Sequence, residues 1–433
     1  MKKRSTAAGI VLVAALSLSA CSGSGSEEAT PADGPVTLTL SGWSLSTTPE
    51  FQALADAYHE KDPDVTVEVK EYDATNYDTL MTADLAAGSG PDLITQKNVK
   101  NVVTYQAGGQ LLDVSDVELP DGIGGKDAYE VDGTQWAVPY RQDAWVLFYN
   151  KALFDQAGVG YPDGSWTWDD YAEQAKALKD GLTAAGSSAA GTYEHSWQST
   201  VQGFANAQAP KADVLSGDYS YLEPYYERAL ELQDEGAQVD YNTVVANKLT
   251  YQAEFGKQNA AMMPMGTWFV ASLIAQQASG DSDDFEWGIA PIPQDGSSTT
   301  GSGDTPVTFG DPTGFGVNAA IDSSKQEAAK GFLAFAASEE GAQVMAGIGV
   351  TPALTSSAVT DAYFGVEGAP ADELSKTAWS EHDTKAENPT SAETAAVQNI
   401  LLDLHTAVMS GSTSIDDAIS TAEGRVENEV GTN

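Results

Sequence analysis

Residues 132–151 of the chain read DGTQWAVPYRQDAWVLFYNK, and this stretch decides how the rest of the sequence is organised. In its first half, Trp136 and Val138 alternate with polar or small neighbours, a period-two pattern typical of a strand. In its second half, residues 145–149 are apolar on both faces, as expected for a strand buried on both sides. The stretch therefore predicts two strands in close succession.

The two expected strands are separated by Arg141, Gln142 and Asp143. Burying three polar side chains is costly unless partners satisfy them. A tight hairpin is not expected here, because the break contains no Gly or Asn to adopt positive φ. We interpret the break as the point where a strand leaves one lobe, crosses an open boundary and enters a second lobe.

The N-terminal segment has the features of a targeting signal. Residues 1–4 are basic, and residues 10–19 are apolar but too short to span a bilayer. Residues 18–21, LSAC, resemble a bacterial lipobox, in which cleavage leaves Cys21 to carry lipid; the alternative is an ordinary signal peptide with a cysteine nearby. We expect a lipoprotein signal peptide over residues 1–20, and a flexible tether over residues 21–35 because this acidic, small-residue stretch lacks large apolar side chains.

Length and charge limit the classes of protein and partner. A chain of 433 residues exceeds the size of one hydrophobic core, so two lobes are expected. The chain has 63 acidic and 21 basic residues, a formal net charge of −42, which repels phosphate backbones and anionic lipid. We therefore expect no nucleic-acid binding and no membrane contact beyond the lipid anchor. The single cysteine also excludes internal disulfides.

Strand and helix patterns alternate in the first part of the chain. Strands are expected at residues 36–40, 65–69 and 91–95, and helices after a cap at Thr47 or Thr48 and over residues 80–87. This alternation predicts a mainly parallel sheet with helices on both faces. Ligands bind beyond the carboxyl ends of the strands in such sheets, so the loops at Trp43 and at residues 96–98 should face one crevice.

Later segments continue the pattern. Thr167 is expected to cap a helix that Gly181 ends, and a strand ending at Gly266 precedes Trp268 at the start of another helix. Residues 307–321 are expected to form a second crossing strand. The polar-aromatic residues 379–383 are expected in a loop, before a helix from Thr394 onward.

Several spaced motifs in this sequence resemble those of extracellular solute-binding proteins of carbohydrate ABC transporters, a maltose-binding-protein-like family. That family marks its first hinge with G-x-x-x-A/G-V/I-P, a few polar residues and then Y-N-K, and the matching residues here are Gly133, Pro139, Asp143, Tyr149, Asn150 and Lys151. Further matches lie at residues 86–92, 109–113, 167–169, 255–268, 287–293 and 349–352.

The resemblance implies an α/β, two-lobed periplasmic-binding-protein fold with the ligand cleft between the lobes. Its hinge would consist of three crossing segments, near Asp143, Gly310 and Ala362. The first lobe would comprise residues 36–142 with 310–360, and the second residues 143–309 with 361–433.

The resemblance also implies a set of ligand-binding residues: Trp43, Gln96, Asn98, Asp143, His195, Trp197, Trp268, Asp311, Trp379 and His382. Other interpretations of individual residues stay open at this point. Trp43 or Trp268 could be a core side chain, Gln96 and Asn98 could lie on a solvated loop, and Asp143 could form a structural ion pair with Arg141.

The function that the resemblance implies is capture of a sugar, an oligosaccharide in particular, at the cell surface and its delivery to the permease subunits of an ABC importer. We expect a monomer without cofactor, metal or catalytic activity. One rival is a secreted carbohydrate-active hydrolase, although the sequence has no G-x-S-x-G elbow and no His/Cys constellation.

A second rival is the same fold with a peptide, metal or phosphate ester as ligand. Anionic ligands require Arg or Lys, and the candidate loops offer only Lys97 and Arg141. A neutral sugar fits this composition better.

Overall fold

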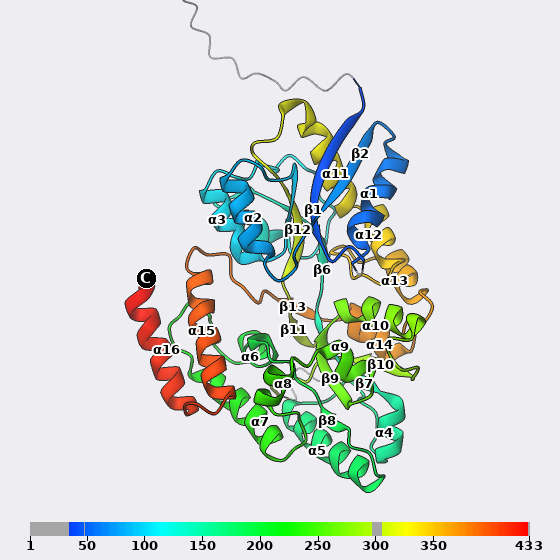
Figure 1. The fold of residues 1–433 in the computed structure, drawn as a ribbon, viewed down its shortest axis with the longest axis vertical. Coiled ribbons are helices and arrows are strands. Elements are labelled where there is room, and N and C mark those ends of the chain that lie inside the picture. Colours follow the sequence, from blue (N-terminus) through cyan, green and yellow to red (C-terminus); the bar gives the residue numbers. More distant parts are fainter. Residues whose placement is uncertain (1–33, 47, 297–304, 432–433) are drawn as a thin grey trace, which may run out of the picture.

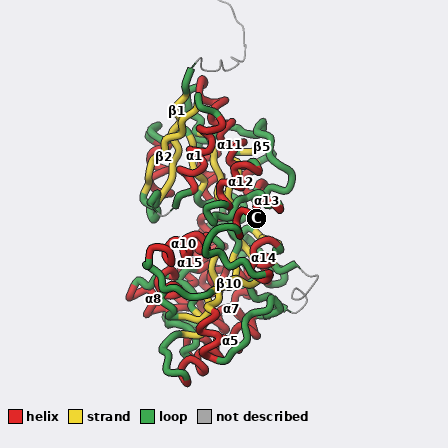
Figure 2. Tube along the Cα trace, turned by 90° about the vertical axis from the view of Figure 1, so that its right-hand side faces the viewer, coloured by secondary structure: helices red, strands yellow, loops and turns green. Residues whose placement is uncertain are grey.

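The computed structural model describes residues 34–46, 48–296 and 305–431. Figure 1 shows two groups of strands and helices one above the other, and Figure 2 shows the same division after a quarter turn. Each group is built around its own sheet. The predicted two-lobed α/β fold is confirmed, and we call the lobe that contains the β1 sheet the first lobe.

The first-lobe sheet has the strand order β2–β1–β3–β12–β6. Its strands are β1 Val36–Trp43, β2 Val65–Tyr72, β3 Leu93–Gln96, β6 Val138–Gln142 and β12 Pro312–Val317. β1 runs parallel to β2 and β3, whereas β12 runs antiparallel to β3 and β6. The sheet is therefore mixed, because one strand returns from the second lobe.

Helices cover both faces of this sheet: α1 Glu50–Lys61, α11 Gln326–Ala337 and α12 Glu339–Ala346 on one side, and α2 Tyr77–Ala86 and α3 Val102–Ala107 on the other. Consecutive residues of β3 point to opposite cores, with Leu93 packing against the first group and Ile94 against the second. This is the alternation of a strand buried on both faces.

The second-lobe sheet has the order β10–β7–β9–β8, and only β8 and β9 are parallel. Its strands are β7 Trp145–Asn150, β8 Ala190–Thr192, β9 Ala260–Gly266 and β10 Trp287–Ala290. The helices whose side chains join this core are α4 Lys151–Ala157, α5 Trp168–Ala184, α6 Gln202–Gln208, α7 Glu223–Asp234, α8 Tyr241–Asn247, α9 Tyr251–Gly256, α10 Trp268–Ser279, α13 Ser357–Phe364, α14 Glu373–Ser380, α15 Thr394–Met409 and α16 Ile415–Glu429. From the first lobe, α12 also contributes Ala342 and Ala346 to this core.

The first two crossings between the sheets lie against each other. β6 ends at Gln142 and β7 begins at Trp145, so the predicted crossing at Asp143 is confirmed. The second runs from β11 (Val307–Phe309), which pairs with β13 (Asp383–Lys385), into β12. A Cβ on Gly310 would lie 2.1 Å from the carbonyl oxygen of Asp143, so only glycine allows this approach.

The third crossing follows α12. Val350 packs in the first-lobe core, whereas Val359 and Tyr363 pack in the second-lobe core. Ala362 lies within α13. We therefore propose that the third crossing spans residues 351–356. The division into residues 36–142 with 310–360 and 143–309 with 361–433 also stays a proposal.

Three local expectations were wrong. Trp43 is the last residue of β1 and not part of a loop. A cap was expected at Thr47 or Thr48, but the N-cap position of α1 is Pro49, which makes no side-chain hydrogen bond. Thr47 lies outside the described residues. Thr167 does cap α5, but the helix continues through Gly181 to Ala184. Gly181 serves packing and does not end the helix: a Cβ there would lie 2.4 Å from the carbonyl oxygen of Ala157, so the glycine lets α4 and α5 pack closely.

Candidate functional site

Four rings of the second lobe gather where it meets the first. His195, Trp197, Tyr251 and Trp268 form what we call the aromatic cluster. The His195 and Trp197 ring centroids are 4.5 Å apart, and Tyr251 lies 5.6 Å from each of them. Trp268 lies 6.5 Å from Trp197. Trp197 is 40% exposed and the other three are half-buried, so the cluster presents ring surface to solvent.

The strand-to-helix turn after β9 holds Trp268 from several sides. Its indole lies over the backbone of Gly266, where a Cβ would come within 2.0 Å of ring atom Cζ3. The ring of Trp145 meets it edge-on at 5.4 Å. The predicted sequence of strand, glycine and Trp at a helix start is thereby confirmed.

Tyr251 was not singled out from the sequence, because it opens an ordinary short helix capped by Thr250. Burial raises the pKa of its hydroxyl, while contacts with Trp268 and Arg141 lower it. Burial also lowers the pKa of His195 to about 4, and its Nδ1 lies 2.8 Å from the Tyr193 hydroxyl. His195 is therefore a neutral hydrogen-bonding group at physiological pH.

Asp143 lies at the edge of the aromatic cluster and is 7% exposed. Its Oδ2 accepts a hydrogen bond from Arg141 Nε at 2.5 Å, and its Oδ1 accepts one from the Thr267 hydroxyl at 2.8 Å. Arg141 Nη1 also donates to Glu50 Oε1 at 2.6 Å. The ion pair that the sequence left as an alternative for Asp143 is thus present, within a larger network.

Three predicted residues lie at the carboxyl ends of first-lobe strands or directly after them. Trp43 packs edge-on against Phe51 and Tyr77, with Lys97 Nζ 5.2 Å from its ring centroid. Asn98 donates to Asp78 at 2.7 Å. Gln96 is only 1% exposed, and both polar atoms of its side chain lack a partner within the protein, so the expectation of a solvated loop does not hold for Gln96.

Asp311 lies in the second crossing and is held by the segment after β13. Its carboxylate accepts hydrogen bonds from the Glu387 and Asn388 amides at 2.9 and 3.1 Å and from the Asn388 side chain at 2.5 Å. Burial and the charge of Asp311 raise the pKa of Glu387 to about 7, and Ser199 donates to Glu387. Asp311 thus joins the second crossing to the segment after β13.

Trp379 and His382 lie elsewhere in the second lobe. Trp379 belongs to α14 and not to the loop expected there, is 1% exposed, and stacks on Tyr363 at 4.4 Å. It therefore offers no open ring face for stacking. His382 lies 3.0 Å from the Trp379 carbonyl through Nε2 and 2.8 Å from the Thr384 hydroxyl through Nδ1, which fixes it locally.

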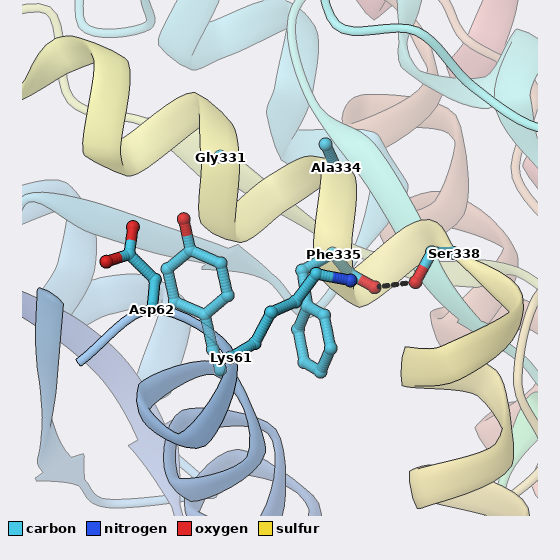
Figure 3. A pocket seen from close by; sticks show the side chains of 7 residues that line it. Lys61, Asp62, Gly331, Ala334, Phe335 and Ser338 are labelled. Carbon is cyan, nitrogen blue, oxygen red and sulfur yellow. Dashed lines mark hydrogen bonds between the residues drawn. The ribbon is translucent and has the colours of Figure 1, made fainter.

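Two cavities lie away from the aromatic cluster. A groove of about 440 Å³ on the first lobe lies between α1 and α11, where Lys61 extends past Phe335 (Figure 3). A cavity of about 410 Å³ beside the hinge is lined by residues that include Gly310, Pro312 and Asn388. Neither is lined by any of the ten ligand-binding residues that the resemblance implies, although Gln142 and Gly310 of the crossings line the second cavity.

The described residues contain no group of three or more His, Cys, Asp or Glu side chains placed to hold a metal ion. In that same part of the chain, no helix is both long and apolar enough to cross a membrane.

Residues 44–343 match the family model described as bacterial extracellular solute-binding protein. Among curated proteins, the mannitol-binding protein of Pseudomonas aeruginosa is 29% identical over 153 residues, which are 34% of this chain and 35% of that protein. The first curated relatives, putative binding proteins of Brucella, match over 36% of their length. The chain thus aligns with only about a third of each of these relatives.

Solved structures match over nearly the whole fold. A sugar transporter from Rhizobium etli in an open conformation is 32% identical, with a TM-score of 0.78 over 90% of this chain and 99% of that one. An ABC substrate-binding protein from Listeria monocytogenes in complex with cycloalternan has a TM-score of 0.74 at 20% identity, over 92% of this chain and 100% of that one. The second match shows the fold alone.

Proposed function

The chain belongs to the bacterial extracellular solute-binding protein family, and we propose that it captures a neutral sugar, an oligosaccharide in particular, for an ABC importer. The single observation that carries the choice of sugar is the aromatic cluster, in which Trp197 and Trp268 expose ring surface at the lobe boundary. Aromatic faces pack against the apolar C–H faces of pyranose rings, and a few polar groups orient the hydroxyls.

The proposed binding residues come from both lobes. Trp43, Gln96 and Asn98 would contact the sugar from the first lobe, and His195, Trp197, Trp268 and the added Tyr251 from the second. The unpartnered amide of Gln96 supports this set, because a buried amide without a partner is costly until something binds it. Three further residues stay candidate ligand contacts, although each already has a hydrogen-bond partner within the protein: Asp143, Asp311 and His382.

The charges at the boundary favour a neutral ligand over a phosphate ester. Arg141 is neutralised by Glu50 and Asp143. Lys97 donates to the Ala74 carbonyl, and burial lowers the pKa of its ammonium group. Both cations that the sequence offered are thus engaged within the protein, whereas recognition of an anionic group needs a free donor with positive charge.

The remaining parts of the proposal concern location and partners. We propose that Cys21, which lies outside the described residues, carries a lipid that holds the exported protein at the outer face of the cell membrane. The monomer would deliver its sugar to permease subunits of the importer. Two relatives are named a mannitol-binding protein and an arabinooligosaccharide-binding protein, which supports a neutral sugar or polyol as the ligand.

The test measures binding and breakdown in the same samples. The purified protein is titrated by calorimetry with a panel of neutral oligosaccharides, monosaccharides, mannitol and glycerol 3-phosphate, and each mixture is then analysed by chromatography. We expect saturable binding of a neutral sugar that is recovered intact. Recovery of shortened sugars would support the hydrolase instead, and selective binding of the phosphate ester would contradict the neutral-ligand proposal.

A further inference from the structure

A buried ion network begins in the first lobe at Glu50, the first residue of α1. The Glu50 side chain is 1% exposed and pairs with Arg141, whose guanidinium also pairs with Asp143. Burial raises the pKa of Glu50, and the positive charge of Arg141 lowers it. Glu50 and Asp143 are the two carboxylates of one shared cation.

The network continues into the second lobe through Thr267. The Thr267 hydroxyl donates to Asp143 Oδ1 at 2.8 Å and accepts from the Ala144 amide at 3.3 Å. The Thr267 amide donates to the Ala144 carbonyl at 2.9 Å. Since Thr267 directly precedes Trp268, an unbroken chain of polar contacts connects α1 of one lobe with the residue that sets the start of α10 in the other.

Net stability alone does not explain why the chain buries the Glu50–Arg141–Asp143 network. A buried ion pair contributes little net stability compared with well-packed apolar side chains, but it fixes geometry, because each charge requires its partner in place. Here the fixed geometry lies in the first crossing and in the turn before Trp268. The Trp268 indole packs on Gly266 and Trp145 and contacts Tyr251, but it is only half-buried, so its orientation also depends on the turn from which it projects.

We propose that Glu50 is a positioning residue for the ligand site: through Arg141, Asp143 and Thr267 it sets the orientation of Trp268, so a first-lobe side chain controls the stacking surface of the second lobe. The inference rests on the proposed sugar-binding function for its consequence on affinity. The orientation of Trp268 is a property of the ligand-free protein and can be measured separately.

The structural test uses ¹⁹F NMR of protein labelled with 5-fluorotryptophan. The chain has nine tryptophans, and the Trp268 resonance is assigned by its loss in Trp268→Phe. We expect Glu50→Gln to shift or broaden this resonance in the ligand-free protein. The control is Glu60→Gln, the same change at an exposed position of the same helix, which should leave it unmoved. An equal response to both variants would overturn the proposal.

A second variant cuts the network at its other end. Thr267→Val removes the hydroxyl while keeping a β-branched shape, and it should move the same Trp268 resonance in the ligand-free protein. If Glu50→Gln does not fold, Thr267→Val still tests whether the polar network orients Trp268. An unchanged Trp268 resonance in Thr267→Val overturns the proposal.

The functional test is a double-mutant cycle on sugar affinity. Glu50→Gln should weaken binding about tenfold in the native chain and less than about twofold in the Trp268→Phe background, because its effect passes through the indole. Equal losses in both backgrounds would overturn the proposal. If no sugar binds the native protein, the proposed function fails, while the NMR result still decides the role of Glu50.

Discussion

The indole of Trp268 lies directly over Gly266, two residues before it, at the turn from β9 into α10. A Cβ at position 266 would come 2.0 Å from Cζ3 of the indole, far closer than van der Waals contact allows. The glycine is therefore needed for the space it leaves. In this way the backbone of one residue determines where the side chain of the other can lie.

We predict that Gly266→Ala weakens sugar binding at least tenfold, because the added methyl group pushes the indole away from its position. The fold should persist, since Trp268 is half-buried and its ring can move outward. Titration calorimetry measures the affinity. Gly160→Ala serves as the control, because a Cβ there meets nothing within 4 Å, and it should bind as the native protein does. Native affinity in Gly266→Ala would show that the ligand does not use this indole.

We predict that Trp268→Ala and Trp197→Ala each cost about 1–3 kcal/mol of binding, or roughly 5- to 150-fold in affinity. Trp197→Ala should leave the melting temperature nearly unchanged, because Trp197 is 40% exposed. The comparison variant is Tyr161→Ala, which removes another aromatic side chain that is 43% exposed but lies outside the cluster. If Trp268→Ala fails to fold, Trp268 is a core residue, and its place in the proposed site is lost.

The elements that the sequence predicted well are those whose signal is local. The strand predicted from the apolar residues 145–149 and the polar break before it depend only on neighbouring side chains, and β7 and its crossing follow that prediction. The cap at Thr167 is equally local, because the capping box closes within three residues. Such features require no knowledge of the rest of the chain.

The misplaced features depend on contacts between distant segments. Gly181 looks like a helix end until Ala157 of α4 is seen to approach its backbone. Trp379 lies in a polar stretch that was expected to be a loop but forms the short helix α14, and its ring is buried by stacking on Tyr363. Glu50 could not be connected with Arg141 from the sequence, because 91 positions separate them.

We predict that Cys21→Ala releases the protein from membrane fractions while leaving sugar affinity intact, because the lipid would be attached at this residue alone. Fractionation of cells that express each form, followed by immunoblotting, measures the distribution. Cys21 lies outside the described residues, so the prediction depends on residues 18–21 of the sequence. Continued retention of Cys21→Ala in the membrane would contradict the anchor.

We predict that Asp143→Asn lowers the melting temperature of the ligand-free protein. The amide keeps an acceptor for Thr267 but leaves Arg141 with only one of its two carboxylates, and breaking a buried pair costs on the order of 3 kcal/mol. Calorimetric melting measures the loss. Asp116→Asn is the matched control, since its ion pair with Lys330 is exposed and should contribute about 0–1 kcal/mol. An intact melting temperature with weakened sugar binding would make Asp143 a ligand contact instead.

The last prediction concerns pH and the hinge carboxyl Glu387. Burial and the neighbouring Asp311 raise its pKa to about 7 from an ordinary value of 4.5, so the folded chain holds this proton more tightly than the unfolded chain does. The resulting stability is fully present below about pH 4.5 and is lost as the pH rises through 7. Melting curves of the native protein and Glu387→Gln between pH 4.5 and 8 measure it. We expect the variant, which resembles the protonated form, to lose less stability over this range than the native protein, whereas Glu427→Gln on the surface of α16 should follow the native curve. Parallel curves for all three proteins would show that Glu387 does not titrate in this range.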